Sequence, residues 1–431
     1  MRGHDDPSQH MKATVRLEHA FLAVEADHEV HAMLELSAPE VTSQQRPRLD
    51  LALVIDRSGS MAGDKLEVTR ACAAFLVRRL RPTDQFALID YDDEVRLLAP
   101  LAAVGPVQGA VMAAINGIRP GGQTNLSGGW LKGVEELNRA TDESVKRVLL
   151  LTDGLANVGV TDSATLASMT GAAAGEGAAT TTIGFGEGFN EDLLTAMADA
   201  GGGNAHWAGT PDEAPAIFAD EFEGLVSLVA QNVSVEVRPG PEVSVVEVLN
   251  EFPTIAVPGG VQVALGDAYS GEQRRVVFSL LVPALAHLGP AKVADAIVRY
   301  TAVGTQVAMH ELTLPVMVNL LNADGAASAP VDAEVTEEVL VLKAARAQDE
   351  AKRLADSGEF DKARRLLAQV ARDLREKVPG SAKAEELAAH AAQLEEAETF
   401  MSRAAFSPAA RKTMHYRTRE MRGRTTKRPK G

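Results

Sequence analysis

The stretch Leu51-Ala52-Leu53-Val54-Ile55-Asp56-Arg57-Ser58-Gly59-Ser60 decides the fold of this chain. Five consecutive apolar residues are typical of a strand that is buried on both faces of a parallel sheet. The oxygen-bearing side chains of Asp56, Ser58 and Ser60 follow directly, at the carboxyl end of that strand. Open α/β sheets bind their ligands at this edge. The stretch therefore predicts an α/β sheet with a binding site where the strand ends.

Two later segments carry side chains of the same kind. Thr124 lies in Gly121-Gly122-Gln123-Thr124-Asn125, and Asp153 directly follows the apolar run 148–151. Carboxylates and hydroxyls are ligands that suit a hard cation such as Mg²⁺ or Mn²⁺. Two carboxylates neutralise a divalent cation without filling its coordination shell, which leaves room for an oxygen of a partner. The alternative is that Asp56 and Asp153 merely cap the helices that follow them.

The predicted metal ligands, Asp56, Ser58, Ser60, Thr124 and Asp153, resemble the complete metal-ion-dependent adhesion site of von Willebrand factor A domains. The resemblance covers roughly residues 48–228. It implies that the three hydroxyls contact the metal and that the two carboxylates hold it directly or through water. It also implies that a protein partner supplies an acidic side chain to the open position.

The pattern of the chain predicts several domains. Strands alternate with helices over 48–229, which indicates a doubly wound, mainly parallel sheet. Residues 230–321 show strands only, which favours an antiparallel β-sandwich. The strands within 1–47 cannot form a sheet of their own, so we expect them to join the sandwich and make the α/β domain an insertion in it. This arrangement resembles bacterial multidomain proteins in which an A domain is flanked by β-sandwich strands.

The C-terminal part is predicted to be helical and then basic. Residues 333–402 are rich in Ala, Glu, Leu, Lys and Arg and suggest three helices, at about 334–356, 360–377 and 382–402. The tail 403–431 has ten Lys and Arg and one acid, a balance of +9. Such a tail is compatible with a disordered terminus, with docking on an acidic surface of this protein or a partner, or with binding to nucleic acid or anionic lipid.

Composition restricts the function classes. The formal charge of the chain is −16, so without its +9 tail the body carries −25 and makes a poor nucleic-acid binder. The single cysteine, Cys72, cannot form an internal disulfide. The first residues lack the apolar core of a signal peptide, and no apolar stretch is long enough to span a bilayer. We therefore expect a cytoplasmic protein without a transmembrane segment.

Sequence motifs for catalysis are missing. The chain has no phosphate-binding Gly-Lys-Ser/Thr loop, and Gly184-Phe185-Gly186-Glu187-Gly188 lacks the spacing of a dinucleotide fingerprint. Ser58 and Ser60 have neither a nucleophile elbow nor a nearby histidine. His206 is predicted to be a structural residue of a loop, and the acidic turn 90–93 is either solvated or a second cation site.

The predicted function is a Mg²⁺-dependent protein-interaction module that binds an acidic residue of a partner and is not an enzyme. Two alternatives remain at this point. The chain could be an accessory subunit of an AAA+ ATPase machine, or a nucleic-acid-associated scaffold that acts through the tail.

Overall fold

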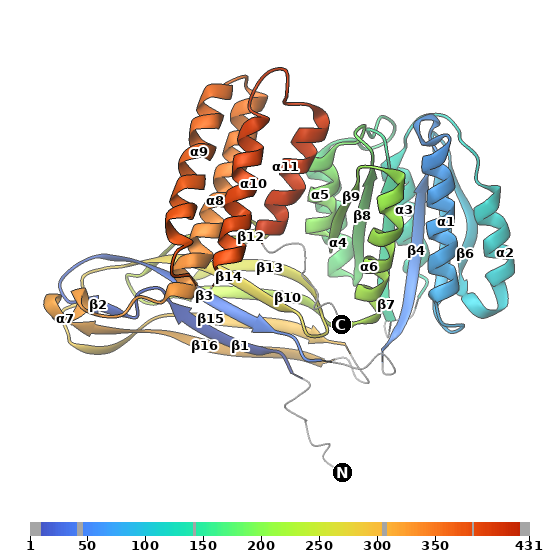
Figure 1. The fold of residues 1–431 in the computed structure, drawn as a ribbon. Coiled ribbons are helices and arrows are strands. Elements are labelled where there is room, and N and C mark those ends of the chain that lie inside the picture. Colours follow the sequence, from blue (N-terminus) through green and yellow to red (C-terminus); the bar gives the residue numbers. More distant parts are fainter. Residues whose placement is uncertain (1–9, 41–45, 141–143, 304–307, 382, 423–431) are drawn as a thin grey trace, which may run out of the picture.

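The computed structural model describes residues 10–40, 46–140, 144–303, 308–381 and 383–422. An α/β domain lies at one end of the molecule and two antiparallel sheets at the other, and a helical domain stands on the sheets beside the α/β domain (Figure 1). Among the described residues, no helix is both long and apolar enough to cross a membrane.

The α/β domain contains a six-stranded sheet in the order β6-β5-β4-β7-β8-β9. All neighbouring strands are parallel except β5 and β6, which are antiparallel. The strands are β4 (Arg48–Asp56), β5 (Gln85–Tyr91), β6 (Val95–Ala103), β7 (Ser144–Thr152), β8 (Ala178–Phe185) and β9 (Gly202–Ala208). The helices are α1 (Asp64–Arg79), α2 (Val104–Gly117), α3 (Leu126–Leu137), α4 (Ser163–Gly175), α5 (Glu191–Ala200) and α6 (Ala214–Val226).

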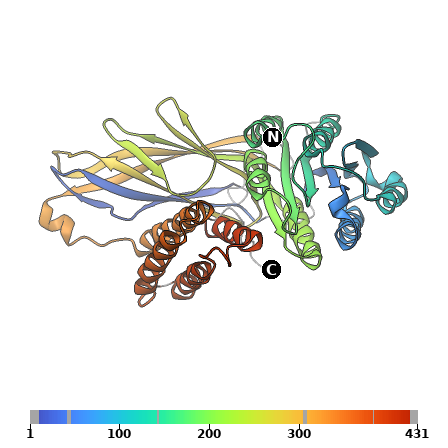
Figure 2. The same ribbon diagram turned by 90° about the horizontal axis from the view of Figure 1, so that it is seen from above.

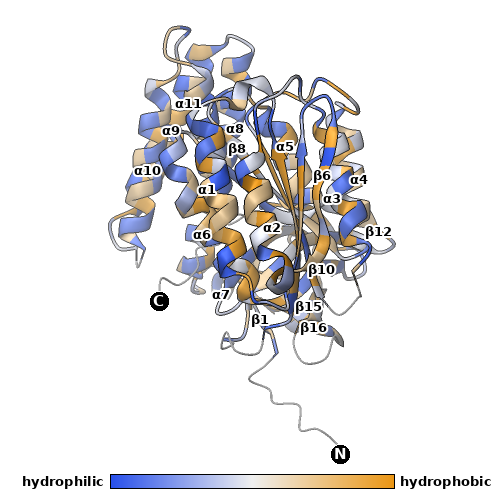
Figure 3. Cartoon of the chain, turned by 90° about the vertical axis from the view of Figure 1, so that its right-hand side faces the viewer, coloured by the Kyte–Doolittle hydropathy of each residue, from blue (hydrophilic) through white to orange (hydrophobic). Residues whose placement is uncertain are grey.

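The apolar run of β4 is buried on both faces of this sheet. Leu51, Leu53 and Ile55 belong to one core with α1, α2 and α6, whereas Ala52 and Val54 belong to a second core with α3, α4 and α5. Successive side chains of a strand point to opposite faces, so a continuous apolar run supplies both cores at once. In Figure 3 the strands of this sheet are coloured mainly as hydrophobic, whereas the helices around them contain both hydrophilic and hydrophobic residues.

The two antiparallel sheets, in which β2 and β16 form the one parallel pair among the described strands, share one apolar core. The first has the order β1-β3-β14-β11 and the second β12-β13-β10-β15-β16-β2. The strands are β1 (Lys12–Leu17), β2 (Phe21–Ala23), β3 (His28–Ser37), β10 (Leu228–Pro239), β11 (Ser244–Val248), β12 (Thr254–Val257), β13 (Gly260–Tyr269), β14 (Gln273–Val282), β15 (Gly289–Ala302) and β16 (Ala308–Leu321). As expected from the sequence, the N-terminal strands join later ones: β3 pairs with β14 and β2 with β16. The α/β domain is thus inserted between β3 and β10.

Several elements were not predicted from the sequence. Residues Gly202–Ala208 form β9, so His206 lies in a strand and not in a loop as predicted. A methyl group added at Gly203 would lie 2.2 Å from the carbonyl oxygen of Thr180 on β8. Glycine is therefore needed for the close contact between β9 and β8. Because glycine has no side chain, it also interrupts the alternation of apolar and polar residues that predicts a strand. Strand β12 and the short helix α7 (Ala323–Ala327) were also not predicted.

The helical domain consists of α8 (Ala333–Asp356), α9 (Phe360–Lys377), α10 (Ala384–Thr399) and α11 (Pro408–Met421). Its first helix packs on the first antiparallel sheet, where Met33 and Val277 meet Val335, Val339 and Leu342 in a small apolar cluster. Seen from above, the helices lie along one side of the sheets, and α11 faces the α/β domain (Figure 2).

The basic segment from residue 403 is helical over much of its described part. Met414 and Met421 of α11 belong to the core of the helical domain. Arg411 and Arg419 form ion pairs with Asp192 and Asp199 of α5. Of the three alternatives for the tail, residues 408–422 therefore follow the second, docking on an acidic surface of this protein. Residues 423–431 lie outside the described part of the chain.

Candidate metal site

The first segment of the site follows β4. The buried carboxylate of Asp56 accepts hydrogen bonds from the Ser58 backbone amide at 2.7 Å and from the Thr152 hydroxyl at 2.6 Å. The hydroxyl oxygens of Ser58 and Ser60 lie 3.1 Å apart. Ser58 is buried and Ser60 is exposed, so the site opens to solvent on the side of Ser60.

The second segment is the glycine loop that carries Thr124. The Gly121 amide donates to the Arg57 carbonyl oxygen at 2.6 Å, and the Gly59 amide donates to the Gly122 carbonyl oxygen at 3.0 Å. The Thr124 amide donates to the side chain of Asn157 at 2.9 Å. These bonds hold the glycine loop against the first segment and fix the position of the Thr124 hydroxyl.

The third segment follows β7. One carboxylate oxygen of Asp153 accepts a hydrogen bond of 2.7 Å from the Ser60 hydroxyl, and the other forms an ion pair with Lys65 of α1. Asp153 is almost completely buried, whereas Lys65 is partly exposed. The carboxylate of Asp153 therefore faces the same space as the two serines.

The three segments converge on one small space. A methyl group added at Gly154 would lie 3.2 Å from Thr124 Oγ1, 3.7 Å from Ser60 Oγ and 3.9 Å from Asp56 Oδ2. Ser58 and Asp153 are joined to this group through Ser60. The structure thus brings all five predicted residues together. A purely oxygen donor set with two carboxylates fits Mg²⁺ or Mn²⁺, which prefer such ligands.

The electrostatics of the site favour a cation. Burial raises the pKa of Asp56 to about 6, hydrogen bonds from Thr152 and Ser58 oppose that rise, and the negative charge of Asp153 adds to it. Two carboxylates with little access to water repel each other unless a positive charge lies between or beside them. Lys65 provides such a charge on one side of Asp153. The described residues contain no cluster of three or more His, Cys, Asp and Glu side chains that could hold a metal ion, so this site would depend on its hydroxyls as well as on its two carboxylates.

Asp56 and Asp153 do not cap the helices that follow them, which was the alternative to a metal site. The residue that precedes α1 as its cap is Gly63, and the cap of α4 is Asp162. Asp56 and Asp153 lie before these caps and are bonded within the site. Neither carboxylate is needed to begin a helix.

The acidic turn after β5 acts as a brace for the glycine loop, a role that the sequence did not reveal. Asp92 forms an ion pair of 2.6 Å with Arg57 and accepts a hydrogen bond of 2.9 Å from the Gly122 amide. Asp93 accepts a bond of 3.2 Å from the Gln123 amide. Asp90 is paired with Arg96. These three carboxylates bind arginine side chains and backbone amides of the protein itself. Their positions are explained without a second metal site.

Gly121→Ala is expected to lower the free energy of unfolding by about 1–3 kcal/mol, the usual cost of overpacking. The new methyl group would lie 1.9 Å from Asp92 Oδ2 and 2.2 Å from Arg57 Nη1, so it would separate a nearly buried ion pair. Chemical denaturation measures the change. Gly109→Ala is the matched control, because nothing lies within 4 Å of its added methyl group. This helical control should stabilise the protein by roughly 0.5–1 kcal/mol. Equal stability of the Gly121→Ala variant and the unmodified protein would contradict the brace.

Comparison with known proteins agrees with the fold. Residues 50–231 match the family model of the von Willebrand factor type A domain. The chain is 28% identical to the uncharacterized protein YfbK of Escherichia coli over 211 residues, which cover 48% of this chain and 36% of that protein. It is 28% identical to the uncharacterized protein sll0103 of Synechocystis over 252 residues, which cover 56% of this chain and 59% of that protein. The chain thus spans about a third to three fifths of these relatives.

A solved structure described as von Willebrand factor type A from Catenulispora acidiphila is similar over 92% of this chain and 90% of that chain, with a TM-score of 0.69 and 17% identity. At this identity the likeness concerns the fold alone. Together the matches show that the chain contains a von Willebrand factor type A domain, the mainly parallel α/β domain described above. Domains of this family are commonly protein-interaction modules.

Proposed function

We propose that this chain is a Mg²⁺-dependent protein-interaction module and not an enzyme. The convergence of five side-chain oxygen ligands from three segments beside Gly154 carries the proposal. Asp56, Ser58, Ser60, Thr124 and Asp153 would hold Mg²⁺ or Mn²⁺. When bound, the cation would supply an electrophilic centre for one carboxylate of a partner protein.

The chain's own residues are arranged for cation binding. Thr152 and the Ser58 amide orient Asp56, and Ser60 orients Asp153 through a hydrogen bond of 2.7 Å. The hydroxyls of Ser58 and Ser60 contact each other, an arrangement suited to shared ligation and not to activating one of them as a nucleophile. Only two of the five ligands are charged, so the bound cation would keep affinity for a further carboxylate.

The expected partner surface is a single exposed Asp or Glu in neutral or basic surroundings, because the rest of this chain is acidic, with a formal charge of −16. We place this interaction in the cytoplasm, where the buried thiol of Cys72 would stay reduced. The described basic residues of α11 are engaged with the protein's own acids, which weighs against nucleic-acid binding through residues 408–422.

Calorimetry tests the metal site. The unmodified protein is expected to bind one Mg²⁺ or Mn²⁺ per chain, and Asp56→Ala/Asp153→Ala is expected to abolish this binding by removing both carboxylate ligands. Metal that binds only the folded state should also raise the melting temperature of the unmodified protein. The matched control is Asp212→Ala/Glu223→Ala, which removes two exposed acids of the same domain. Equal metal binding by the site variant and this control would refute the proposal.

A pulldown from native cytoplasm tests the partner. A protein captured with Mg²⁺, and lost with EDTA or with Thr124→Ala, supports capture through the metal. Recovery of an AAA+ ATPase under these conditions would identify the chain as an accessory subunit of that machine. A partner that binds equally well in EDTA, but not after deletion of 403–431, would move the function to the basic segment.

A further inference from the structure

Helix α11 bridges the helical domain and the α/β domain. The helix lies between the other helices of the helical domain and the α/β domain (Figures 1 and 2). Its methionines pack into the helical domain, as described above, while charged and aromatic side chains of the helix contact α5 and β9. Tyr416 stacks on Trp207 of β9, with ring centroids 5.8 Å apart. The helix thus contacts a domain that ends more than 170 residues earlier in the sequence.

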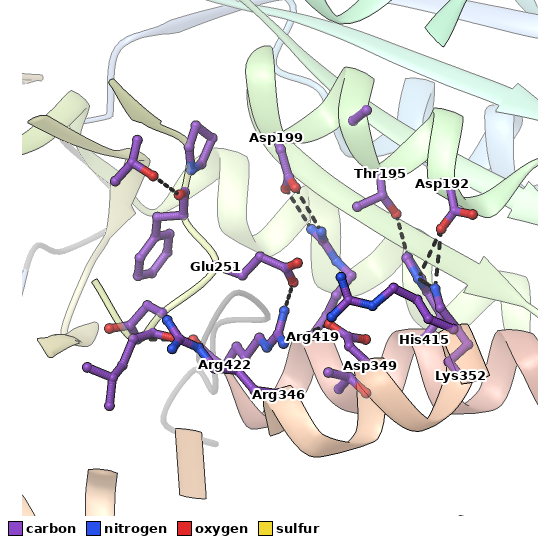
Figure 4. A pocket seen from close by; sticks show the side chains of 18 of the residues that line it. Asp192, Thr195, Asp199, Glu251, Arg346, Asp349, Lys352, His415, Arg419 and Arg422 are labelled. Carbon is purple, nitrogen blue, oxygen red and sulfur yellow. Dashed lines mark hydrogen bonds and ion pairs between the residues drawn. The ribbon is translucent and has the colours of Figure 1, made fainter. Parts of the chain in front are cut away.

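Several ion pairs join α11 to α5. The two helices border a cavity of about 900 Å³ (Figure 4). Across it, Arg419 pairs with Asp199 at 2.9 Å, and His415 contacts the Thr195 hydroxyl at 2.9 Å. Contacts of this kind are directional, so they fix the position of α11 more sharply than apolar packing alone would.

Lys412 of α11 contacts the segment that follows β8. Its ammonium group donates to the Phe189 carbonyl oxygen at 2.8 Å, forms an ion pair of 2.6 Å with Glu191, and lies 4.4 Å from the centre of the Phe189 ring. The side chain is only 3% exposed. A buried ammonium is costly unless its donors are satisfied, so these contacts hold Lys412 and residue 189 in one arrangement.

The loop that Lys412 holds lies directly against a predicted metal ligand. Residues 186–190 connect β8 to α5. A methyl group added at Gly188 would lie 2.8 Å from the carbonyl oxygen of Asp153, and one added at Gly184 would lie 2.3 Å from the Phe189 ring. The loop is therefore packed between α11 on one side and the backbone of Asp153 on the other.

We infer that Lys412 is a positioning residue of the metal site: through Phe189 and the loop 186–190 it fixes the backbone of Asp153, so that α11 and the metal site are coupled. The inference rests on the proposed metal site. Coupling between two sites is reciprocal, so metal binding should in turn stabilise the docking of α11.

The sign of the effect separates positioning from simple charge repulsion. Lys412 is a cation, so removing its charge would strengthen the binding of Mg²⁺ if it acted through Coulomb forces alone. Loss of positioning has the opposite effect, because Asp153 would no longer be held in its binding geometry. A variant without the ammonium group that binds Mg²⁺ more weakly can therefore be explained only by the structural route.

The test compares the full-length protein with Lys412→Met, Lys412→Arg and Arg417→Met by Mg²⁺ calorimetry. Arg417→Met is the matched control, since Arg417 lies on the same helix but pairs with Glu396 of the helical domain. Lys412→Met is expected to raise the Kd for Mg²⁺ about fivefold or more, the lower end of typical coupling. Lys412→Arg should restore part of the affinity, and Arg417→Met should bind like the unmodified protein. Hydrogen exchange in 408–421 should slow on adding Mg²⁺ to the unmodified protein.

Gly188→Ala tests the same coupling by changing the loop 186–190 instead of α11. It replaces Lys412→Met as the test if that variant does not fold. Its methyl group would press on the Asp153 carbonyl oxygen, and severalfold weaker Mg²⁺ binding by a folded variant is expected. Unchanged or tighter Mg²⁺ binding by folded Lys412→Met overturns the inference and leaves the metal site standing. If Lys412→Met does not fold, unchanged affinity in Gly188→Ala, together with Mg²⁺-independent exchange in α11, overturns it. An unmodified protein that binds no Mg²⁺ overturns both the inference and the proposed function.

Discussion

Deleting residues 1–45 is expected to unfold both antiparallel sheets while leaving the α/β domain folded. Strand β3 lies between β1 and β14, so the first sheet would keep only β14 and β11. Two strands alone are marginally stable at best. Val30, Ala32 and Leu34 of β3 are fully buried in the shared core, and their loss would expose its interior. Met33 on the opposite face contacts the helical domain, so α8 should loosen as well.

Hydrogen exchange measures this effect segment by segment. Amides of β14 should lose their protection in the deletion variant, whereas those of β4 and β7 should keep it, because the α/β domain has two cores that contain no residue before 49. Deletion of residues 1–9 is the control, since it removes none of the three N-terminal strands. If β14 stays protected without residues 1–45, the N-terminal strands are dispensable and the composite arrangement is not what stabilises the sheets.

Asp267→Ala is expected to lower the free energy of unfolding by about 3–5 kcal/mol, the usual result of removing one partner of a buried ion pair. Asp267 of β13 pairs with Arg147 of β7, and this pair joins the antiparallel sheets to the α/β domain. Arg147 is fully buried, and its Nε and Nη1 atoms have no hydrogen-bond partner within the described structure. Burial raises the pKa of Asp267, and the nearby Arg147 opposes that shift. Without the aspartate, a guanidinium would remain buried without its carboxylate partner.

Chemical denaturation of Asp267→Ala and of Asp295→Ala provides the comparison. Asp295 pairs with Lys292 in solvent at 2.9 Å, and its removal should cost about 0–1 kcal/mol. The double variant Arg147→Met/Asp267→Leu should regain much of the stability lost in Asp267→Ala, because it leaves no buried charge. If Asp267→Ala and Asp295→Ala cost the same, the contact between the two domains does not depend on this ion pair.

Contacts within the domains and contacts between them differ in how far they could be predicted. The apolar run of β4 and the alternation of β3 are visible in the sequence, because the order of apolar and polar residues in each strand shows which of its faces are buried. The pairing of Arg147 with Asp267 was not predicted, because nothing near either residue distinguishes it from an exposed charge. His206 was placed in a loop for a similar reason: the glycines that let β9 approach β8 also interrupt the strand pattern.

The sequence by itself determined the alternation of strands and helices and the five oxygen-bearing side chains proposed as ligands, because these depend on residues that are adjacent in the chain and on where each strand ends. The tertiary structure decided how those ligands are held. The brace between Arg57 and Asp92 joins two strand ends. Lys412 contacts the Phe189 carbonyl oxygen across 223 residues of sequence. Such contacts form only when segments that are distant in the sequence pack together, and a local pattern of residues carries no information about which distant surface will lie beside it.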